Sequence, residues 1–276
     1  MKLDAHQHFW HYTPADYGWI GPDMQVLQKD HLPPNLALLT KSVDIEGTVA
    51  VQARQSLAET EWLLNLAERY TLLRGVVGWV DLRSPDLRSQ LERFSAHPKL
   101  VGVRHVVQDE PDDQFMLRDD FMRGIGLLAD FDLTYDILIF ARHLPIACEL
   151  VKKFPNQPFV LDHIAKPLIK TGQITPWDAD LRRLAALPNV YCKVSGMVTE
   201  ANWSTWQPAD FRPYLDVIFE AFGPARLMFG SDWPVCTVAG SYEQVVKLVA
   251  DYIQQLSSTE QAQIWGETAQ KFYGLE

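Results

Sequence analysis

The sequence predicts an α/β protein built as a (β/α)8 barrel, and three observations lead to this class. Eight short runs rich in β-branched and aromatic residues recur along the chain. Helical patterns separate these runs, which is the order expected of a parallel sheet. The length of 276 residues is typical of a barrel of eight strand–helix units. The predicted strands are Leu3–His8, Thr48–Ala53, Arg74–Val80, Val101–Val107, Thr134–Ile139, Phe159–Asp162, Val190–Val194 and Leu227–Gly230.

Capping signals mark several of the predicted helix starts. Ser56 stands three residues before Glu59, ahead of an apolar run, which is the spacing of a capping box. The same device follows Ser241 and Ser258. Gly274 is a plausible end for the last helix, because glycine accepts the left-handed backbone that closes many helices.

The chain is expected to form one domain over residues 1–276. No repeat, low-complexity tract or Gly/Ser-rich linker divides it. An open, doubly wound sheet is the structural alternative. However, neither GxGxxG nor GxxxxGK[ST] follows any predicted strand, so the usual nucleotide ligand of that architecture has no site.

Composition narrows the class of partner. Hydrophobic residues make up 47% of the chain, enough for a sizeable core, and the formal net charge is −10. Nucleic acid or an anionic membrane is therefore not expected as a partner, since both favour a basic face. No apolar run is long enough to span a bilayer. The three scattered cysteines indicate reduced thiols, so we expect a cytoplasmic protein. The sequence does not determine the oligomeric state, so an oligomer remains an alternative to a monomer.

Polar side chains recur where the predicted strands end. Barrel active sites lie at these carboxyl ends and are built from the loops that follow. The loops leaving the strands are long and those entering them are short, which favours a site at the exit end. The residues concerned are His6, His8, Gln52, Arg54, Arg104, Tyr135, His163, Lys193 and Asp232.

The first strand ends in His6-Gln7-His8. Residues i and i+2 of a strand point to the same side, so two imidazoles are expected to face one space. Such a pair binds a divalent metal or, without one, a polar substrate. With a later strand-end histidine and Asp232 after the last strand, the pattern is that of a metal hydrolase.

Five segments carry a resemblance to a known family: DAHQHFW, GVRHVVQ, LDHIAKP, KVSGMVTEA and MFGSDWPV. Together they resemble the amidohydrolase superfamily, in particular its amidohydrolase-related branch of sugar lactonases, which includes L-fuconolactonases and L-rhamnonolactonases. The similarity runs from the first strand to the last. It implies a (β/α)8 barrel that hydrolyses a ring ester, with His6, His8, His163 and Asp232 at the reaction centre and Arg104 on the substrate.

The chain departs from the two-metal pattern of that superfamily. The fourth-strand motif has no lysine, and the fifth strand does not end in histidine, so a binuclear site is not expected. One Zn²⁺ held by His6, His8 and Asp232 and a site without a required metal both stay open.

The expected reaction is the opening of an aldonolactone to the free sugar acid. Asp232 is predicted to deprotonate the attacking water, while His6, His8 and His163 stabilise the oxyanion. Sugar hydroxyls are expected to bind Gln52, Arg54, Arg104, Tyr135, Lys166, Lys193 and Glu200. The alternatives are a metal-dependent decarboxylase or amidase of the same superfamily and a non-catalytic sugar-acid binder.

Overall fold

The structure is a computed structural model that describes residues 1–275. Its eight strands pair in parallel in sequence order, β1 to β8. Each strand lies within two residues of its predicted position, so the predicted fold class is confirmed. The strands are β1 (Leu3–Gln7), β2 (Gly47–Val51), β3 (Leu73–Gly78), β4 (Leu100–Val106), β5 (Thr134–Leu138), β6 (Phe159–Leu161), β7 (Val190–Val194) and β8 (Leu227–Phe229).

The sheet closes between its first strand and the segment after its last. Gln7 and Trp233 form a parallel bridge. The His8 amide donates to the Trp233 carbonyl at 2.7 Å, and the Asp232 amide donates to the His6 carbonyl at 2.8 Å. This closure places the two ends of the sheet, and the polar residues on them, side by side.

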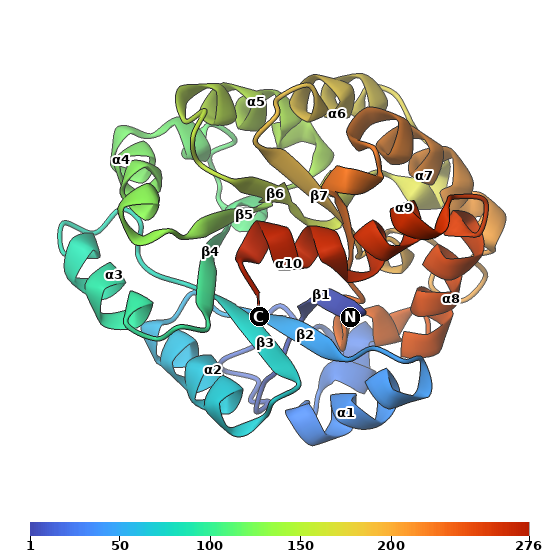
Figure 1. The fold of residues 1–276 in the computed structure, drawn as a ribbon, viewed down its shortest axis with the longest axis horizontal. Helices are drawn as coiled ribbons and strands as arrows, with labels where there is room; N and C mark the ends of the chain where they lie inside the picture. Colours follow the sequence, from blue (N-terminus) through green and yellow to red (C-terminus); the bar gives the residue numbers. More distant parts are fainter. Residues whose placement is uncertain (276) are drawn as a thin grey trace.

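Helices surround the barrel (Figure 1). They are α1 (Pro33–Ser42), α2 (Leu57–Arg69), α3 (Leu87–Ser95), α4 (Asp119–Leu127), α5 (Leu144–Lys153), α6 (Trp177–Ala185), α7 (Pro208–Phe222) and α8 (Tyr242–Ile253). Two short helices follow, α9 (Ser258–Ala262) and α10 (Thr268–Tyr273).

The predicted capping boxes are largely confirmed. The Ser56 side chain accepts from the Glu59 amide at the start of α2, and Ser241 begins α8 in the same way. Gly274 follows α10 with a φ of 64°. The cap of α9 is Ser257 rather than Ser258, because the Ser257 hydroxyl is the one that accepts from the backbone.

One end of the barrel is closed by the C-terminal helix. Figure 1 shows α10 lying across the end at which the chain begins. Ala269, Phe272 and Tyr273 of α10 join a cluster of buried apolar side chains from the strands. The larger part of the core lies between the strands and the outer helices. The site is therefore restricted to the opposite end of the barrel, where the strands terminate.

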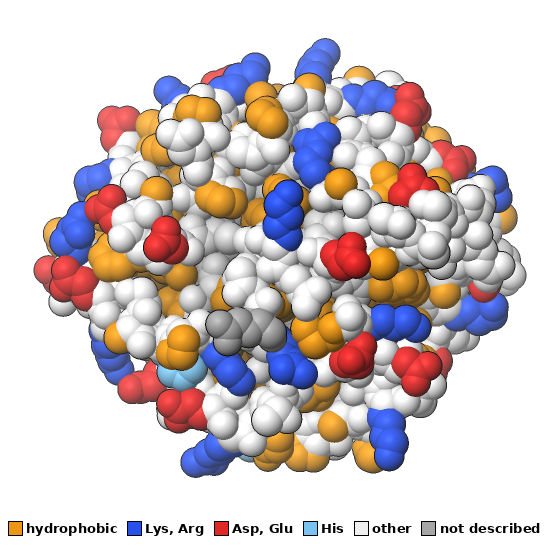
Figure 2. Space-filling model, in the orientation of Figure 1, with side chains coloured by type: hydrophobic (Ala, Val, Ile, Leu, Met, Phe, Trp, Pro, Cys, Tyr) orange, Lys and Arg blue, Asp and Glu red, His pale blue; other side chains and the backbone are white. Residues whose placement is uncertain are grey.

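The surface carries no continuous field of one sign on the face that Figure 2 shows, where acidic and basic side chains are interspersed. Within residues 1–275, no helix has the length and hydropathy needed to cross a membrane. The three cysteines are free and buried, as the sequence predicts.

Candidate active site

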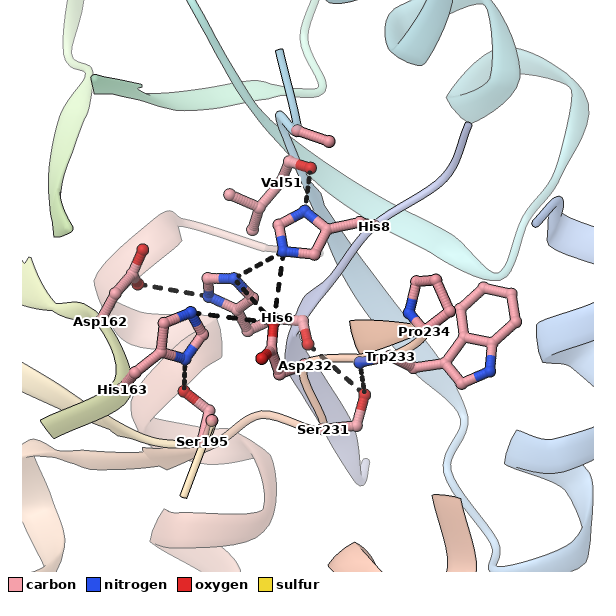
Figure 3. A network of polar contacts seen from close by, with 12 residues as sticks. His6, His8, Val51, Asp162, His163, Ser195, Ser231, Asp232, Trp233 and Pro234 are labelled. Carbon is pink, nitrogen blue, oxygen red and sulfur yellow. Dashed lines mark hydrogen bonds and ion pairs between the residues drawn. The ribbon is translucent and has the colours of Figure 1, made fainter. Parts of the chain in front are cut away.

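Three histidines and one aspartate meet at the carboxyl end of the strands (Figure 3). The Nε2 atoms of His6 and His8 lie 3.2 Å apart, which confirms that the two imidazoles share one space. Oδ1 of Asp232 lies 3.4 Å from His8 Nε2 and 3.9 Å from His6 Nε2. The Nε2 atom of His163 is 3.8 Å from the same carboxylate oxygen. Four side chains from the first, sixth and eighth strand ends thus converge on one point.

The other ring nitrogen of each histidine is engaged elsewhere. His8 Nδ1–H donates to the Val51 carbonyl at 2.8 Å, and in the corresponding neutral tautomer Nε2 faces the centre without a hydrogen. His163 Nδ1 is hydrogen-bonded to Ser195 Oγ at 2.9 Å. His6 Nδ1 is hydrogen-bonded to Lys193 Nζ at 3.1 Å and lies 3.2 Å from Oδ1 of Asp162. These contacts fix the orientation of the rings, so their Nε2 atoms are held in place before any ligand arrives.

A second carboxylate supports the segment that carries Asp232. Asp4 accepts from the Ser231 amide at 2.8 Å and from its hydroxyl at 2.6 Å. The Tyr242 hydroxyl donates to Asp4 at 3.1 Å. Burial raises the pKa of Asp4 to about 6, although these hydrogen bonds lower it. Asp4 faces away from the pocket and holds the strand-8 segment in place, so its role is structural.

A layer of buried charges lies beneath the histidines, inside the barrel. Asp162 pairs with Arg104 Nη1 at 2.9 Å and with Lys193 Nζ at 3.1 Å. Lys193 also pairs with Asp136, and the Tyr273 hydroxyl of α10 donates to Asp136. All four charged side chains are at most 3% exposed. Two positive and two negative groups balance one another, which makes their burial tolerable.

Burial and neighbouring charges set the protonation of the centre. Burial lowers the pKa of His163 to about 4 and that of His6 well below its usual value. Both rings are therefore neutral at pH 7. Burial alone would raise the pKa of Asp232, but His163, His8 and His6 together hold it below the usual range of an aspartate. Asp232 is thus an ionised carboxylate able to accept a proton.

His163 belongs to an unusual stretch of backbone. His163, Ile164, Ala165 and Lys166 all have positive φ, between 49° and 60°. A left-handed residue other than glycine costs roughly 1–2 kcal/mol, and four in a row are rare. Gly196 lies against the turn: a Cβ there would come within 2.5 Å of the His163 ring. The turn directs two side chains, His163 and Lys166, to the pocket.

The pocket above the centre has a volume of about 600 Å³, which is ample for a monosaccharide derivative. Of the predicted site residues, seven line it: His8, Arg54, Arg104, His163, Lys166, Glu200 and Asp232. His6 lies just below, fully buried, with its Nε2 atom facing the centre.

Three predicted substrate-binding residues are not part of the pocket lining. Tyr135 lies on the outer side of β5, packed between Phe121 and Phe159, because alternate residues of a strand face opposite sides. Lys193 is held in the buried charged layer. Gln52 is also buried, and its amide group donates to the Arg104 carbonyl. The pocket lining thus holds none of these three, and their contact with substrate stays a prediction.

Sequence reasoning missed several residues of the pocket wall. They come from the exit loops, whose path strand patterns do not reveal. Met24, Val235 and Val238 form an apolar part of the wall, and Gln108 brings a buried amide oxygen that has no partner within residues 1–275. Trp19, 43% exposed, also lines the pocket. The aromatic residues of the exit loops, such as Trp19, were the sequence feature that could have indicated which loops form the pocket wall.

The centre meets the requirements of a divalent metal site. Ligand atoms of His6, His8 and Asp232 all lie within 4.8 Å of one another, and those of His6, Asp162 and His163 form a second such group. Imidazole nitrogens whose other ring nitrogen is hydrogen-bonded, together with a carboxylate, are the donor set of zinc hydrolases. Arg104 Nη1 lies 3.3 Å from His6 Nε2, so an N–H of Arg104 can also satisfy this nitrogen.

The fold and the centre together define a (β/α)8 barrel with a histidine–carboxylate hydrolase-type site at the carboxyl ends of its strands. The chain belongs to the amidohydrolase family, whose model matches residues 3–275. An L-fucono-1,5-lactonase of Burkholderia multivorans is 43% identical over 286 residues, which cover 100% of this chain and 96% of that relative. An L-fucono-1,5-lactonase of Burkholderia ambifaria is 34% identical, with the same coverage.

Solved structures agree with this membership. A crystal structure of an amidohydrolase from Burkholderia multivorans with bound zinc has a TM-score of 0.96 at 43% identity and 100% coverage of both chains. A dihydroxybenzoic acid decarboxylase from Polaromonas with bound manganese has a TM-score of 0.69 at 14% identity over 99% of this chain and 96% of that one. That likeness extends to the fold alone.

Proposed function

We propose that this protein is a lactonase that hydrolyses a sugar-derived lactone to the free sugar acid, with L-fuconolactone as its first candidate substrate. The observation that carries the proposal is the full-length similarity to two L-fucono-1,5-lactonases, one of them 43% identical. The decarboxylase alternative depends on a neighbour that is 14% identical, so it is not favoured.

The proposed mechanism begins with Asp232. Its carboxylate is ionised and lies at the floor of the pocket, where it can take a proton from a water molecule that attacks the lactone carbonyl. Asp232 then returns the proton to the ring oxygen as the C–O bond breaks. The reaction thus consumes one water, forms the acid and leaves Asp232 as it began.

Two of the imidazoles would act on the carbonyl oxygen. His6 and His163 lie where negative charge develops during the attack and can present an Nε2–H to it, whereas His8, whose Nδ1–H is donated to Val51, would serve through its Nε2 lone pair as a metal ligand. A metal ion held by His6, His8 and Asp232 would supply Lewis-acid polarisation of the carbonyl. Zinc is the proposed ion, since the donor set suits it and a zinc-bound relative is 43% identical.

Substrate hydroxyls would be bound by charged residues around the pocket. Arg54, Arg104, Lys166 and Glu200 line it and are the proposed contacts. Burial raises the pKa of Glu200, although the nearby Lys166 opposes this rise. Within residues 1–275, neither Lys166 nor Glu200 is held in an ion pair, so both are available to a ligand.

The test is a pH-indicator assay on L-fucono-, L-rhamnono-, L-galactono- and D-arabinono-lactones, with and without chelator. Acid release above the spontaneous rate on at least one lactone is expected. Loss on chelation, with recovery on adding Zn²⁺, would assign the metal a required role. No turnover on the whole panel would overturn the lactonase proposal in favour of an amidase, a decarboxylase or a binder.

A further inference from the structure

The left-handed turn His163–Lys166 is held from outside the pocket by one indole group. Trp177, the first residue of α6, donates its indole N–H to the Ile164 carbonyl at 2.7 Å. Both residues are buried, at 3% and 0% exposure. The carbonyl is thus satisfied by a side chain rather than by backbone or solvent, which a buried polar group requires.

Trp177 is itself firmly placed. Its ring packs against Tyr214 of α7, with centroids 5.4 Å apart. The Tyr214 hydroxyl donates to the carbonyls of Leu168 and Gln173, on the loop that leaves the turn. The indole therefore joins a rigid pair of helices to the middle of the turn.

Two further hydrogen bonds support the turn, both at its first residue. The Lys166 amide donates to the His163 carbonyl at 2.8 Å, and His163 Nδ1 is hydrogen-bonded to Ser195 Oγ at 2.9 Å. None of its four residues is glycine, although all have positive φ. A backbone with this conformational cost persists only where its surroundings impose it. The contact at Ile164 lies at the centre of the segment, between the two residues that face the pocket.

We propose that Trp177 is a positioning residue: its hydrogen bond to Ile164 imposes the left-handed turn that directs both His163 and Lys166 to the pocket. The structural part of this inference stands on the contacts above, and its kinetic part rests on the proposed lactonase activity. Trp177 touches neither the centre nor the pocket, so its effect passes through the turn.

The first experiment is hydrogen–deuterium exchange on Trp177→Phe, which keeps an aromatic ring and removes the donor. Trp206→Phe is the matched control, because Trp206 also donates its indole N–H to a backbone carbonyl, that of Ala239, at 2.7 Å. We expect exchange over residues 163–166 to accelerate by about tenfold or more in Trp177→Phe and to stay unchanged in Trp206→Phe. Unchanged exchange in Trp177→Phe would overturn the proposal.

The second experiment measures lactone turnover. Trp177→Phe is expected to lower kcat on the order of 10-fold to 10²-fold, since small misplacements of a catalytic group have effects of this size. In a His163→Asn background the same substitution should lower kcat by a smaller factor, because the part of its effect that passes through His163 is already lost. Equal losses in both backgrounds would contradict a role through His163.

A rescue variant separates positioning from packing. Ala165→Gly lowers the cost of the left-handed backbone without restoring the indole. When Ala165→Gly is added to Trp177→Phe, we expect exchange over residues 163–166 to slow. The double variant also allows the measurement if Trp177→Phe alone does not fold. No recovery would indicate that Trp177 acts by packing. If the wild type hydrolyses no lactone, the proposed function fails, and the exchange experiments alone decide whether Trp177 holds the turn.

Discussion

Oδ1 of Asp232 lies 3.4 Å from Nε2 of His8, although these residues come from opposite ends of the chain. Closure of the barrel between β1 and the segment after β8 brings them together. His8 is fixed by the Val51 carbonyl, and Asp232 is carried by a segment that Asp4 holds. Both partners are therefore in place before a ligand binds, which is what a water-activating or metal-binding pair needs.

Metal binding should depend on His8. His8→Ala removes an Nε2 ligand whose orientation the Val51 carbonyl fixes. We expect the wild type to take up about one zinc ion per chain, and His8→Ala to bind it at least about tenfold more weakly. Equilibrium dialysis followed by metal analysis measures both.

His11→Ala is the control for this measurement. His11 is exposed and paired with Asp30, away from the centre. Its removal should leave zinc binding unchanged. Equal zinc uptake by His8→Ala and the wild type would contradict the assigned ligand set.

The buried charged layer should be important for stability. Asp162→Asn removes the partner that Arg104 and Lys193 share inside the barrel. Lys193 keeps Asp136, but the layer is left with one buried positive charge in excess, which is expected to lower the free energy of unfolding by about 3–5 kcal/mol. Urea denaturation at pH 7 measures the change.

Asp130→Asn provides the comparison, since Asp130 pairs with Arg88 at the surface with both side chains more than half exposed. Its loss should change stability by less than about 1 kcal/mol. If the two variants were equally stable, the buried layer would have no special part in holding the barrel.

Stability should also fall in acid because of His163. Burial lowers its pKa to about 4 in the folded protein, against about 6.5 for an ordinary histidine. As the pH drops from about 6.5 to 4, the unfolded chain binds a proton that the folded chain does not. Folding is therefore weakened across this window, by up to about 3 kcal/mol. Urea denaturation at pH 7 and pH 5 measures the free energy of unfolding at each pH. It should fall less between the two in His163→Asn than in the wild type, and an identical fall in both would refute this account.

Tyr135→Phe tests whether Tyr135 contacts the substrate. The Tyr135 hydroxyl is buried and has no hydrogen-bond partner within residues 1–275. Its removal takes away an unsatisfied group, so stability should be equal or slightly higher. KM and kcat should not change, because the ring lies outside the barrel. A clear rise in KM would return Tyr135 to the substrate site.

The elements of the fold that follow from local patterns were predictable. Each strand is a compact apolar run, and the caps at Ser56 and Ser241 have side-chain acceptors at the expected spacing. His6 and His8 share a face for the same local reason. The cap of α9 shifted by one residue because Ser257 and Ser258 are both serine and only geometry separates them.

What strand patterns could not supply was side-chain direction at the ends of the strands. Tyr135 and Asp136 are neighbours, yet one faces the outer helices and the other faces Lys193 inside the barrel. The left-handed turn at His163 was equally hidden, since none of its residues is glycine. Its conformation follows from long-range contacts such as that of Trp177 with Ile164.

The most direct test compares L-fuconolactone hydrolysis by the wild type and by Asp232→Asn in the same buffer. The wild type should open the lactone well above the spontaneous rate. Asp232→Asn should fold normally and lose turnover by a factor on the order of 10²–10⁴, because an amide cannot accept the proton of the attacking water. Near-normal turnover in Asp232→Asn, or no turnover in the wild type, would contradict the account.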